Sequence, residues 1–298
     1  MPTTDSQDNR SHVPVMVTEV LDWLNVQPAG TYFDGTIGLG GHATAVHSLL
    51  NQQGKLIGFD LDEEALEITR TKFDASSPPV VLHHNSYDKF PEVSFESGYT
   101  PVNGMLLDLG LSSLQMDTPE RGFSYAADGP LDMRFDKNSG IPASELIRIT
   151  AESDLADLIY KYGEERRSRP IARSIKHAKS MNSIADLTEA IRRVTPPAHR
   201  NRSHARVFQA LRIAVNHELD NLIRFLKLFP EHMAIGGRIV ILSYHSLEDR
   251  LVKQRFKALA AEKVYRILTK KPVRPSADEI AVNRRARPAK LRAAERLS

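Results

Sequence analysis

The chain contains no cysteine among its 298 residues. Disulfide bonds, thiolate zinc sites and cysteine-ligated iron–sulfur clusters are therefore excluded, as is any mechanism in which a cysteine thiolate attacks a pyrimidine ring. Long apolar runs are absent too, since no stretch approaches the roughly 20 apolar residues that span a bilayer. The polar first residues lack the apolar core of a signal peptide. We therefore expect a cytoplasmic protein with no membrane partner, and no ligand cluster in the sequence indicates a metal site.

Positive charge is unevenly distributed along the chain, although the net charge is only +3. Residues 166–212 contain twelve Lys or Arg against two acids, and residues 263–298 contain eleven against three. Clustered positive charge of this kind is typical of a surface that binds a polyanion. The charge pattern therefore predicts a nucleic-acid partner. The alternative explanation of the charge clusters is solvated helix faces and a basic tail.

Short apolar segments alternate with helical patterns in the first 108 residues and again near the end of the chain. This alternation is typical of an α/β protein with a parallel, doubly wound sheet. Helices are expected at 42–50, 62–73 and 247–262. Strands are expected at 31–34, 55–60, 80–83, 102–108, 238–242 and 265–268.

A different pattern separates these two parts. Residues 115–140 are polar and rich in turn-forming residues, and four helical patterns follow at 143–162, 166–180, 183–194 and 205–229. We therefore interpret the chain as one discontinuous α/β domain, residues 1–114 and 216–298, interrupted by a mostly helical insert over residues 115–215.

Four of the predicted strand ends carry residues suited to a nucleoside cofactor. In open α/β sheets, ligands bind at the carboxyl ends of the strands. A glycine-rich turn after the first strand would let the backbone pass close to a ligand. Asp60, 22 residues after Gly38, could accept both hydroxyls of a ribose. The residues concerned are Gly38, Gly40, Gly41, Asp60, Tyr87 and Asp108.

The same turn distinguishes between cofactors. The glycines do not form the G-x-G-x-x-G pattern of dinucleotide-binding proteins, and nothing resembles a GxxxxGK[ST] phosphate loop. Asp34 lies at the mouth of the turn, where a carboxylate would repel a pyrophosphate and attract a cationic sulfonium with its amino group. The pattern thus favours S-adenosylmethionine over a nicotinamide cofactor.

Several blocks of the sequence resemble signatures of the RsmH (MraW) family, the bacterial 16S rRNA cytosine-N4 methyltransferases. The resemblance covers roughly residues 12 to 296. The two most specific blocks are Phe33–His42 and Leu106–Gln115. The others are Arg121–Ser124, Gly129–Arg134, Tyr162–Arg166, Phe208–Arg212, Ser243–Arg250 and Asn283–Glu295.

The resemblance implies a Rossmann-like class I methyltransferase sheet, with a helical insert that serves substrate recognition. It implies methyl transfer from S-adenosylmethionine to the N4 amine of a cytidine in the decoding region of 16S rRNA, so the partner is the small ribosomal subunit. The chain departs from the family at Tyr87, where Phe is common, in the lead-in before Phe208, and at Asn283-Arg-Arg. The implied cofactor contacts are Gly40, Gly41, His42, Asp60, Tyr87, Asp108 and Gln115.

The sequence leaves the acceptor of the amine's N–H groups open. Many amino-methyltransferases carry an Asp/Asn-Pro-Pro-aromatic tetrapeptide after the fourth strand, whereas this chain has Asp108-Leu-Gly-Leu. The acceptor could be a backbone carbonyl near Leu109–Gly110, or Asp108 itself as a catalytic residue. We further hypothesise that Arg134 and His245 contact the RNA. The alternatives are an ion pair of Arg134 with a neighbouring Asp, and a helix-capping or buried His245.

Other functions stay open at this point. The chain could methylate adenine N6 or a ribose hydroxyl, it could be an inactive RNA-binding module for ribosome assembly, or it could be a nicotinamide dehydrogenase. Intact glycines and acids at the strand ends argue against the inactive module. The sequence is compatible with a homo-oligomer but does not indicate one.

Overall fold

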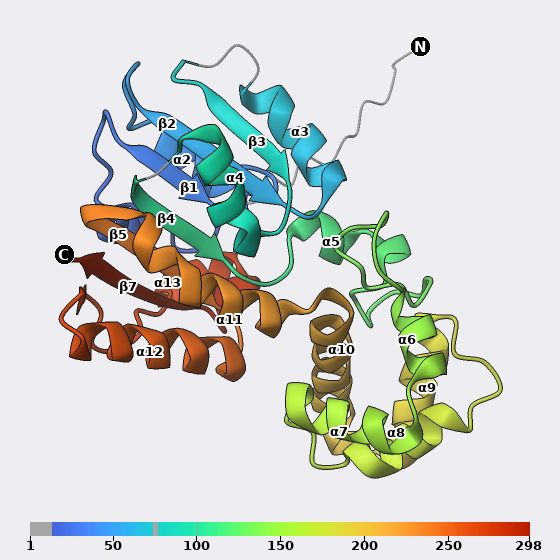
Figure 1. Cartoon of the computed structure of the whole chain (residues 1–298). Coiled ribbons are helices and arrows are strands. Elements are labelled where there is room, and N and C mark those ends of the chain that lie inside the picture. The colour runs from blue at the N-terminus through green and yellow to red at the C-terminus, as the bar shows by residue number, and fades with distance from the viewer. Residues whose placement is uncertain (1–13, 74–76, 100) are drawn as a thin grey trace, which may run out of the picture.

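The computed structural model describes residues 14–73, 77–99 and 101–298. A seven-stranded sheet forms its centre, in the order β3-β2-β1-β4-β5-β7-β6 (Figure 1). Strands β1 to β5 run parallel to one another, and β7 runs antiparallel to both of its neighbours. The strands are β1 (Thr31–Asp34), β2 (Lys55–Asp60), β3 (Val80–His84), β4 (Val102–Asp108), β5 (Met233–Ser243), β6 (Tyr265–Ile267) and β7 (Lys290–Arg296).

Helices cover both faces of this sheet because successive strand residues point to opposite sides. Phe33 and Ile57 pack into one core with α4, α11 and α12, whereas Tyr32 and Leu56 pack into the other with α1, α2 and α3. The bounds are α1 (Val17–Leu24), α2 (Gly41–His47), α3 (Glu63–Phe73), α4 (Phe90–Ser97), α11 (Glu218–Leu228) and α12 (Ser246–Ala261). The short helix α13 (Ala277–Val282) precedes β7.

The segment between β4 and α11 has a hydrophobic core of its own. Its buried residues run from Phe123 to Val215 and include no strand residue of the sheet. Figure 1 shows these helices grouped beside the sheet, with α10 leading back to it through α11. They are α5 (Ser113–Asp117), α6 (Ala143–Ile149), α7 (Glu152–Gly163), α8 (Ser168–Lys176), α9 (Ile184–Val194) and α10 (Arg200–Asn216).

Two helices expected as single elements are each divided in two. The pattern over 143–162 forms α6 and α7, and the pattern over 205–229 forms α10 and α11. His217 separates the second pair with a left-handed backbone, φ 52°. Apolar periodicity continues across such a break, so the break itself is invisible in the pattern.

Strand β7 was not predicted from the sequence, and it makes the otherwise parallel sheet a mixed one. This strand inserts between β5 and β6, and both pairings are antiparallel. Four consecutive residues, 291–294, are buried, but they read Leu-Arg-Ala-Ala between charged residues. Alanine and charged residues favour helix by propensity, and here the burial between two strands overrides that preference. No helix among the described residues is long and apolar enough to cross a membrane.

Candidate cofactor and substrate site

One cavity opens at the carboxyl ends of the parallel strands, as expected for an open α/β sheet. The space between its walls, including the part open to solvent, is about 1070 Å³. It is bordered by the ends of β1, β2 and β4, the segment after β3, and the starts of α11 and α12. Six residues that the sequence assigned to the cofactor line it: Gly41, His42, Asp60, Tyr87, Asp108 and Gln115. The seventh, Gly40, directly precedes α2.

The glycine turn after β1 has the backbone that the sequence predicted. Gly38 and Gly40 have φ angles of +49° and +77°, which L side chains rarely adopt. A Cβ on Gly41 would lie 2.9 Å from Pro14 Cγ, so no side chain fits there without a shift. The turn therefore presents backbone rather than side chains to the cavity.

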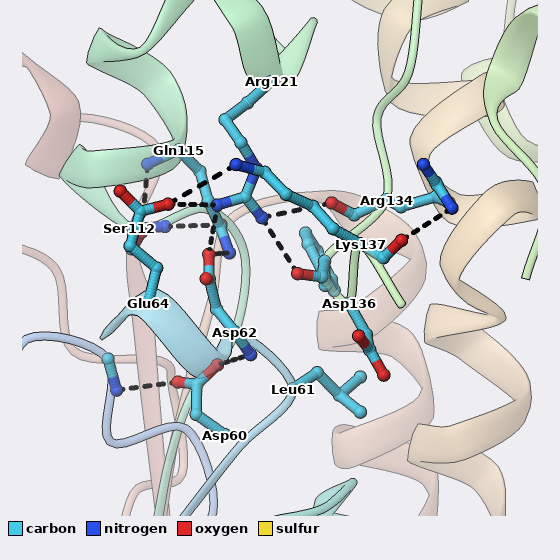
Figure 2. A network of polar contacts seen from close by, with 12 residues as sticks. Asp60, Leu61, Asp62, Glu64, Ser112, Gln115, Arg121, Arg134, Asp136 and Lys137 are labelled. Atoms are coloured by element: carbon cyan, nitrogen blue, oxygen red, sulfur yellow. Dashed lines mark hydrogen bonds and ion pairs between the residues drawn. The ribbon is translucent and has the colours of Figure 1, made fainter. Parts of the chain in front are cut away.

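Asp60 ties this turn to the end of β2. Its Oδ2 accepts the backbone N–H of Gly38 at 2.7 Å, and its Oδ1 accepts that of Asp62 at 2.9 Å (Figure 2). Burial raises the pKa of Asp60 to about 6 despite these hydrogen bonds. A carboxylate has about four acceptor positions, so two remain for the hydroxyls of a ribose.

Asp34 is a second buried acid at the same edge. It is 3% exposed and accepts the backbone N–H of Thr36 at 3.1 Å. Burial raises the pKa of Asp34 to about 7, and nearby His42 counteracts this only in part. A positive ligand group would favour the ionised form.

His42 and Asp108 face each other across the cavity. His42 Nε2 lies 3.4 Å from Asp108 Oδ2, and neither ring nitrogen of His42 has a hydrogen-bond partner. Burial opposes the charged ring, but the Asp108 carboxylate raises the pKa of His42 overall. Buried polar groups are seldom left unpaired, so these nitrogens are suited to a ligand that supplies the partner.

Asp108 is held at the end of β4 by two contacts. Its backbone N–H donates to Thr36 Oγ1 at 2.6 Å, and its Oδ1 accepts the hydroxyl of Tyr244 at 2.7 Å. Tyr244 also lies against Gly110, where a Cβ would be 3.3 Å from the ring. Gly110 has φ +110°, so the chain after β4 turns sharply beside this ring.

Tyr87 follows β3, as expected, and lines the cavity. Its ring packs edge-on against Phe225 with 5.6 Å between ring centroids, and its hydroxyl donates to the carbonyl of Glu218 at 3.4 Å. Burial raises the pKa of Tyr87 well above its ordinary value, so the hydroxyl stays protonated. These contacts fix the ring that was expected to face a purine.

Gln115 lies in α5 with its polar atoms engaged inside the protein. Its Oε1 accepts the backbone N–H of Ser112 at 3.1 Å, and its Nε2 donates to Asp62 Oδ2 at 2.9 Å. Asp62 in turn donates its backbone N–H to Asp60. Gln115 therefore lines the cavity and also supports the loop after β2.

Arg121 is a site residue whose role the sequence did not reveal. Its side chain is fully buried, and Nη1 donates to Asp62 Oδ2 at 2.7 Å. Nη2 donates to the carbonyls of Phe135 at 2.9 Å and Arg134 at 3.2 Å (Figure 2). Phe135 lines the cavity. One guanidinium thus joins the loop after β2 to the loop before α6. The sequence does not indicate this link, because nothing in it shows that Arg121 is buried or which acid it pairs with.

Arg134 and His245 are not among the residues that line the cavity. Arg134 donates from Nε and Nη2 to the two oxygens of Asp132, at 2.9 and 2.8 Å. His245 precedes α12, where its Nδ1 accepts the backbone N–H of Glu248 at 3.4 Å. Each residue thus makes the local contact that was the alternative to RNA binding.

Two acids that the sequence did not single out also line the cavity, at its acidic end, where α11 and α12 begin. They are Glu218 at the start of α11 and Glu248 in the first turn of α12. Both lie more than 100 residues after β4 in the sequence, and only the packing of α11 and α12 brings them to the site. A sequence signal existed for Glu248 alone, inside the Ser243–Arg250 block.

The sheet order, the antiparallel β7, the glycine turn after β1 and the acid ending β2 define a Rossmann-like class I methyltransferase, an α/β enzyme that uses S-adenosylmethionine. The fold class predicted from the sequence is confirmed. The chain belongs to the MraW methylase family, whose sequence model matches residues 9–297.

Individual relatives match over nearly the full length. The chain is 42% identical over 298 residues to "Ribosomal RNA small subunit methyltransferase H" of Acidobacterium capsulatum, covering 97% of this chain and 99% of that protein. It is 43% identical to the protein of the same name from Trichodesmium erythraeum, covering 97% and 100%. It is 44% identical to the protein of the same name from Sorangium cellulosum, covering 96% of this chain and 91% of that protein. Membership of a methylase family removes the dehydrogenase alternative.

Proposed function

We propose that this protein transfers a methyl group from S-adenosylmethionine to the exocyclic N4 amine of a cytidine in the decoding region of 16S rRNA. The match of the MraW methylase family to residues 9–297 carries the proposal. Relatives at 42–44% identity are named as small-subunit ribosomal RNA methyltransferases, which supports the rRNA substrate. The N4 amine of cytidine follows from the family resemblance of the sequence.

The residues around the cavity fit S-adenosylmethionine. Asp60 and Asp108 line the cavity, and the buried Asp34 lies at the same edge of the sheet. These acids suit a cationic sulfonium and its amino group, and His42 offers unpaired ring nitrogens. When bound, the cofactor supplies a methyl group that its positive sulfur has already activated. The proposed cofactor contacts are Gly40, Gly41, His42, Asp60, Tyr87, Asp108 and Gln115.

Each of these residues would bind a different part of the cofactor. The glycines allow close approach of the backbone, Asp60 accepts the ribose hydroxyls, and Tyr87 offers its ring to the adenine. Asp108 lies at the end of β4 beside His42, so it would hold the reacting end of the ligand in line for displacement. Tyr244 fixes the Asp108 carboxylate in that position.

We propose that residues 115–215 form a substrate-recognition domain inserted into a methyltransferase domain of residues 1–114 and 216–298. The helices over 143–216 have a separate hydrophobic core, which supports this division. These helices and their connecting segments also carry exposed cations suited to the phosphate backbone. These include Arg166, Arg167, Arg169, Lys179 and Arg202. Arg134 and His245 stay proposed RNA contacts. To bind RNA, Arg134 would have to release Asp132, and His245 would have to release Glu248.

The partner is then the small ribosomal subunit or its 16S rRNA, and we propose the cytoplasm as the compartment because ribosomal subunits are found there. The target base has to leave its stack to reach an enclosed cavity. Phe135 lines the cavity and packs against the core of the helical segment. Its ring would therefore border the route by which the base enters the cavity.

Affinity for S-adenosylmethionine should rise by about tenfold between pH 5.5 and pH 8. Burial raises the pKa of Asp34 to about 7 and that of Asp60 to about 6. Both acids are therefore largely protonated at the low end and largely ionised at the high end. There Asp34 attracts the cationic end of the cofactor, and Asp60 is a stronger acceptor for the ribose hydroxyls. Calorimetric titration across this range measures the effect. Asp34→Asn should flatten the curve, and an equally steep curve in that variant would contradict the role of Asp34.

The proposed function is tested with methyl-labelled S-adenosylmethionine and small ribosomal subunits that lack the modification. After incubation, the RNA is digested to nucleosides and the labelled nucleoside is identified. We expect the label in N4-methylcytidine. Label in N6-methyladenosine or in a ribose-methylated nucleoside would assign a different target. The absence of label, with S-adenosylmethionine bound, would favour the inactive RNA-binding module.

A further inference from the structure

The carboxylates of Glu218 and Glu248 take no part in the cofactor contacts proposed above. Only the backbone carbonyl of Glu218 does so, because it accepts the hydroxyl of Tyr87. The side chains of Glu218 and Glu248 are 8% and 3% exposed. Ligand atoms of these two acids and His245 all lie within 4.8 Å of one another. Two buried acids so close together are unfavourable unless other groups compensate their charge.

Glu218 has a cation beside it, and Glu248 has N–H groups directed at its oxygens. Arg212 donates from Nε to Oε1 of Glu218 at 2.8 Å and from Nη2 to Oε2 at 2.9 Å. Glu248 Oε1 lies 3.2 Å from His245 Nε2, and Glu248 Oε2 accepts the backbone N–H of Tyr244 at 2.9 Å. The carboxylates are therefore held in one orientation and keep acceptor positions for a ligand.

The cluster is suited to a neutral N–H donor rather than to a metal ion. Both oxygens of Glu218 already face the guanidinium of Arg212, whose positive charge would repel a cation. His245 Nε2 is buried and lies 3.2 Å from Glu248 Oε1 without the alignment of a hydrogen bond, so the cluster has unused polar capacity. An exocyclic amine is uncharged and presents two N–H groups.

Tyr244 connects this cluster to the end of β4. Its backbone N–H donates to Glu248, and its hydroxyl donates to Asp108 Oδ1 at 2.7 Å. Glu248 and Asp108 therefore contact the backbone and the hydroxyl of one tyrosine, and both line the same cavity. The other oxygen of Asp108 faces His42. Both oxygens of Glu248 also have neighbours, Tyr244 N–H and His245 Nε2. Because Asp108 is assigned to the cofactor, Glu248 is the acid of this pair that is available to a second ligand.

We propose that the Glu218–Glu248 end of the cavity is the subsite for the target amine, and that Glu248 is a catalytic residue whose carboxylate accepts one N–H of that amine. This inference rests on the proposed function. The hydrogen bond turns the lone pair of the nitrogen toward the methyl group. The N–C bond forms while the methyl–sulfur bond breaks, with its electron pair left on sulfur. One N–H proton passes to the Glu248 carboxylate and from there to solvent.

The same contact would discriminate cytosine from uracil. Cytosine presents an amine to the carboxylate, whereas uracil would present a carbonyl oxygen, and two acceptors repel each other. A glutamine at position 248 could donate to that oxygen. The Glu248→Gln variant should therefore lose the preference for cytosine in binding as well as in turnover.

The test compares the wild type with Glu248→Gln in single-turnover methylation of unmodified small subunits. We expect the rate to fall by about 10²-fold or more, as for loss of a general base, while the Kd of S-adenosylhomocysteine changes less than about threefold. Glu295→Gln is the matched control. Glu295 is a part-buried acid of β7 that pairs with Arg238 in the middle of β5, away from the cavity, so its variant should keep the wild-type rate.

A second readout uses binding alone. With S-adenosylhomocysteine at saturation, the wild type should bind subunits carrying the target cytidine more tightly than subunits with uridine there, by about tenfold, and Glu248→Gln should not. Unchanged rate and preference in Glu248→Gln, with N4-methylcytidine formed by the wild type, would overturn the inference alone. A wild type that forms no N4-methylcytidine would overturn the proposed function and this inference with it.

The wild-type protein supplies an independent test if the variant does not fold. A crystal structure with cytidine and S-adenosylhomocysteine should place the N4 atom within hydrogen-bond distance of Glu248, about 3.2 Å or less. A cytidine bound in the cavity with its amine directed to Asp108 or to the carbonyls at 109–110 would overturn the assignment.

Discussion

Replacing Arg121 with methionine should lower the free energy of unfolding by about 3–5 kcal/mol. The Arg121 side chain is fully buried, and its partner Asp62 is 4% exposed. Without the guanidinium, the Asp62 carboxylate keeps Gln115 as a side-chain donor but loses its opposite charge. The carbonyls of Phe135 and Arg134 lose a donor as well. Urea unfolding monitored by circular dichroism measures the change.

Arg70→Met is the matched control for this substitution. Arg70 pairs with Glu67 on the surface of α3, where the two side chains are 46% and 65% exposed. Removing an exposed pair should cost at most about 1 kcal/mol. The double variant Arg121→Met/Asp62→Leu should recover part of the lost stability because no charge is then left buried. Equal losses for Arg70→Met and Arg121→Met would show that the buried pair has no special role.

Replacing Asp60 with alanine should weaken the binding of S-adenosylmethionine by about 100-fold or more. Hydrogen bonds to a charged group contribute about 1.5–3 kcal/mol each, and the carboxylate is proposed to accept two hydroxyls. The substitution also leaves the backbone N–H groups of Gly38 and Asp62 without their acceptor. Isothermal titration calorimetry gives the Kd, and Asp60→Asn should lie between alanine and the wild type.

Glu63→Gln controls for the loss of one negative charge in the same loop. Glu63 is exposed at the start of α3 and accepts a hydrogen bond from Asn138 at 3.1 Å. Its variant should bind S-adenosylmethionine within about twofold of the wild type, because an exposed charge is screened by solvent. A wild-type Kd in folded Asp60→Ala would remove Asp60 from the proposed cofactor contacts.

The parallel strands at the centre of the sheet could be predicted closely. The expected bounds 31–34, 55–60 and 102–108 are those of β1, β2 and β4. Each is a short apolar run that ends at an acid or a glycine turn, so the local pattern contains the information. Parallel strands bring their carboxyl ends to one edge, and the predicted cofactor residues therefore gathered in one cavity without any knowledge of long-range contacts.

β7 and the helix breaks could not be predicted in this way. β7 is alanine-rich and charged, and it becomes a strand because β5 and β6 each offer it an open edge. The left-handed backbone of His217 ends α10 and starts α11, although the apolar pattern continues through it. In both places a tertiary contact outweighs a local preference.

The sequence by itself determined the α/β class, the edge of the sheet at which the site lies, and the methylase family. Only the tertiary structure decided which partner each charged side chain has. Arg121 pairs with Asp62, 59 residues away, and Glu218 and Glu248 reach the cavity from two different helices. The physical reason is that an ion pair depends on distance and burial in three dimensions. The sequence does not distinguish a charged residue that is buried in the folded protein from one that stays exposed to solvent.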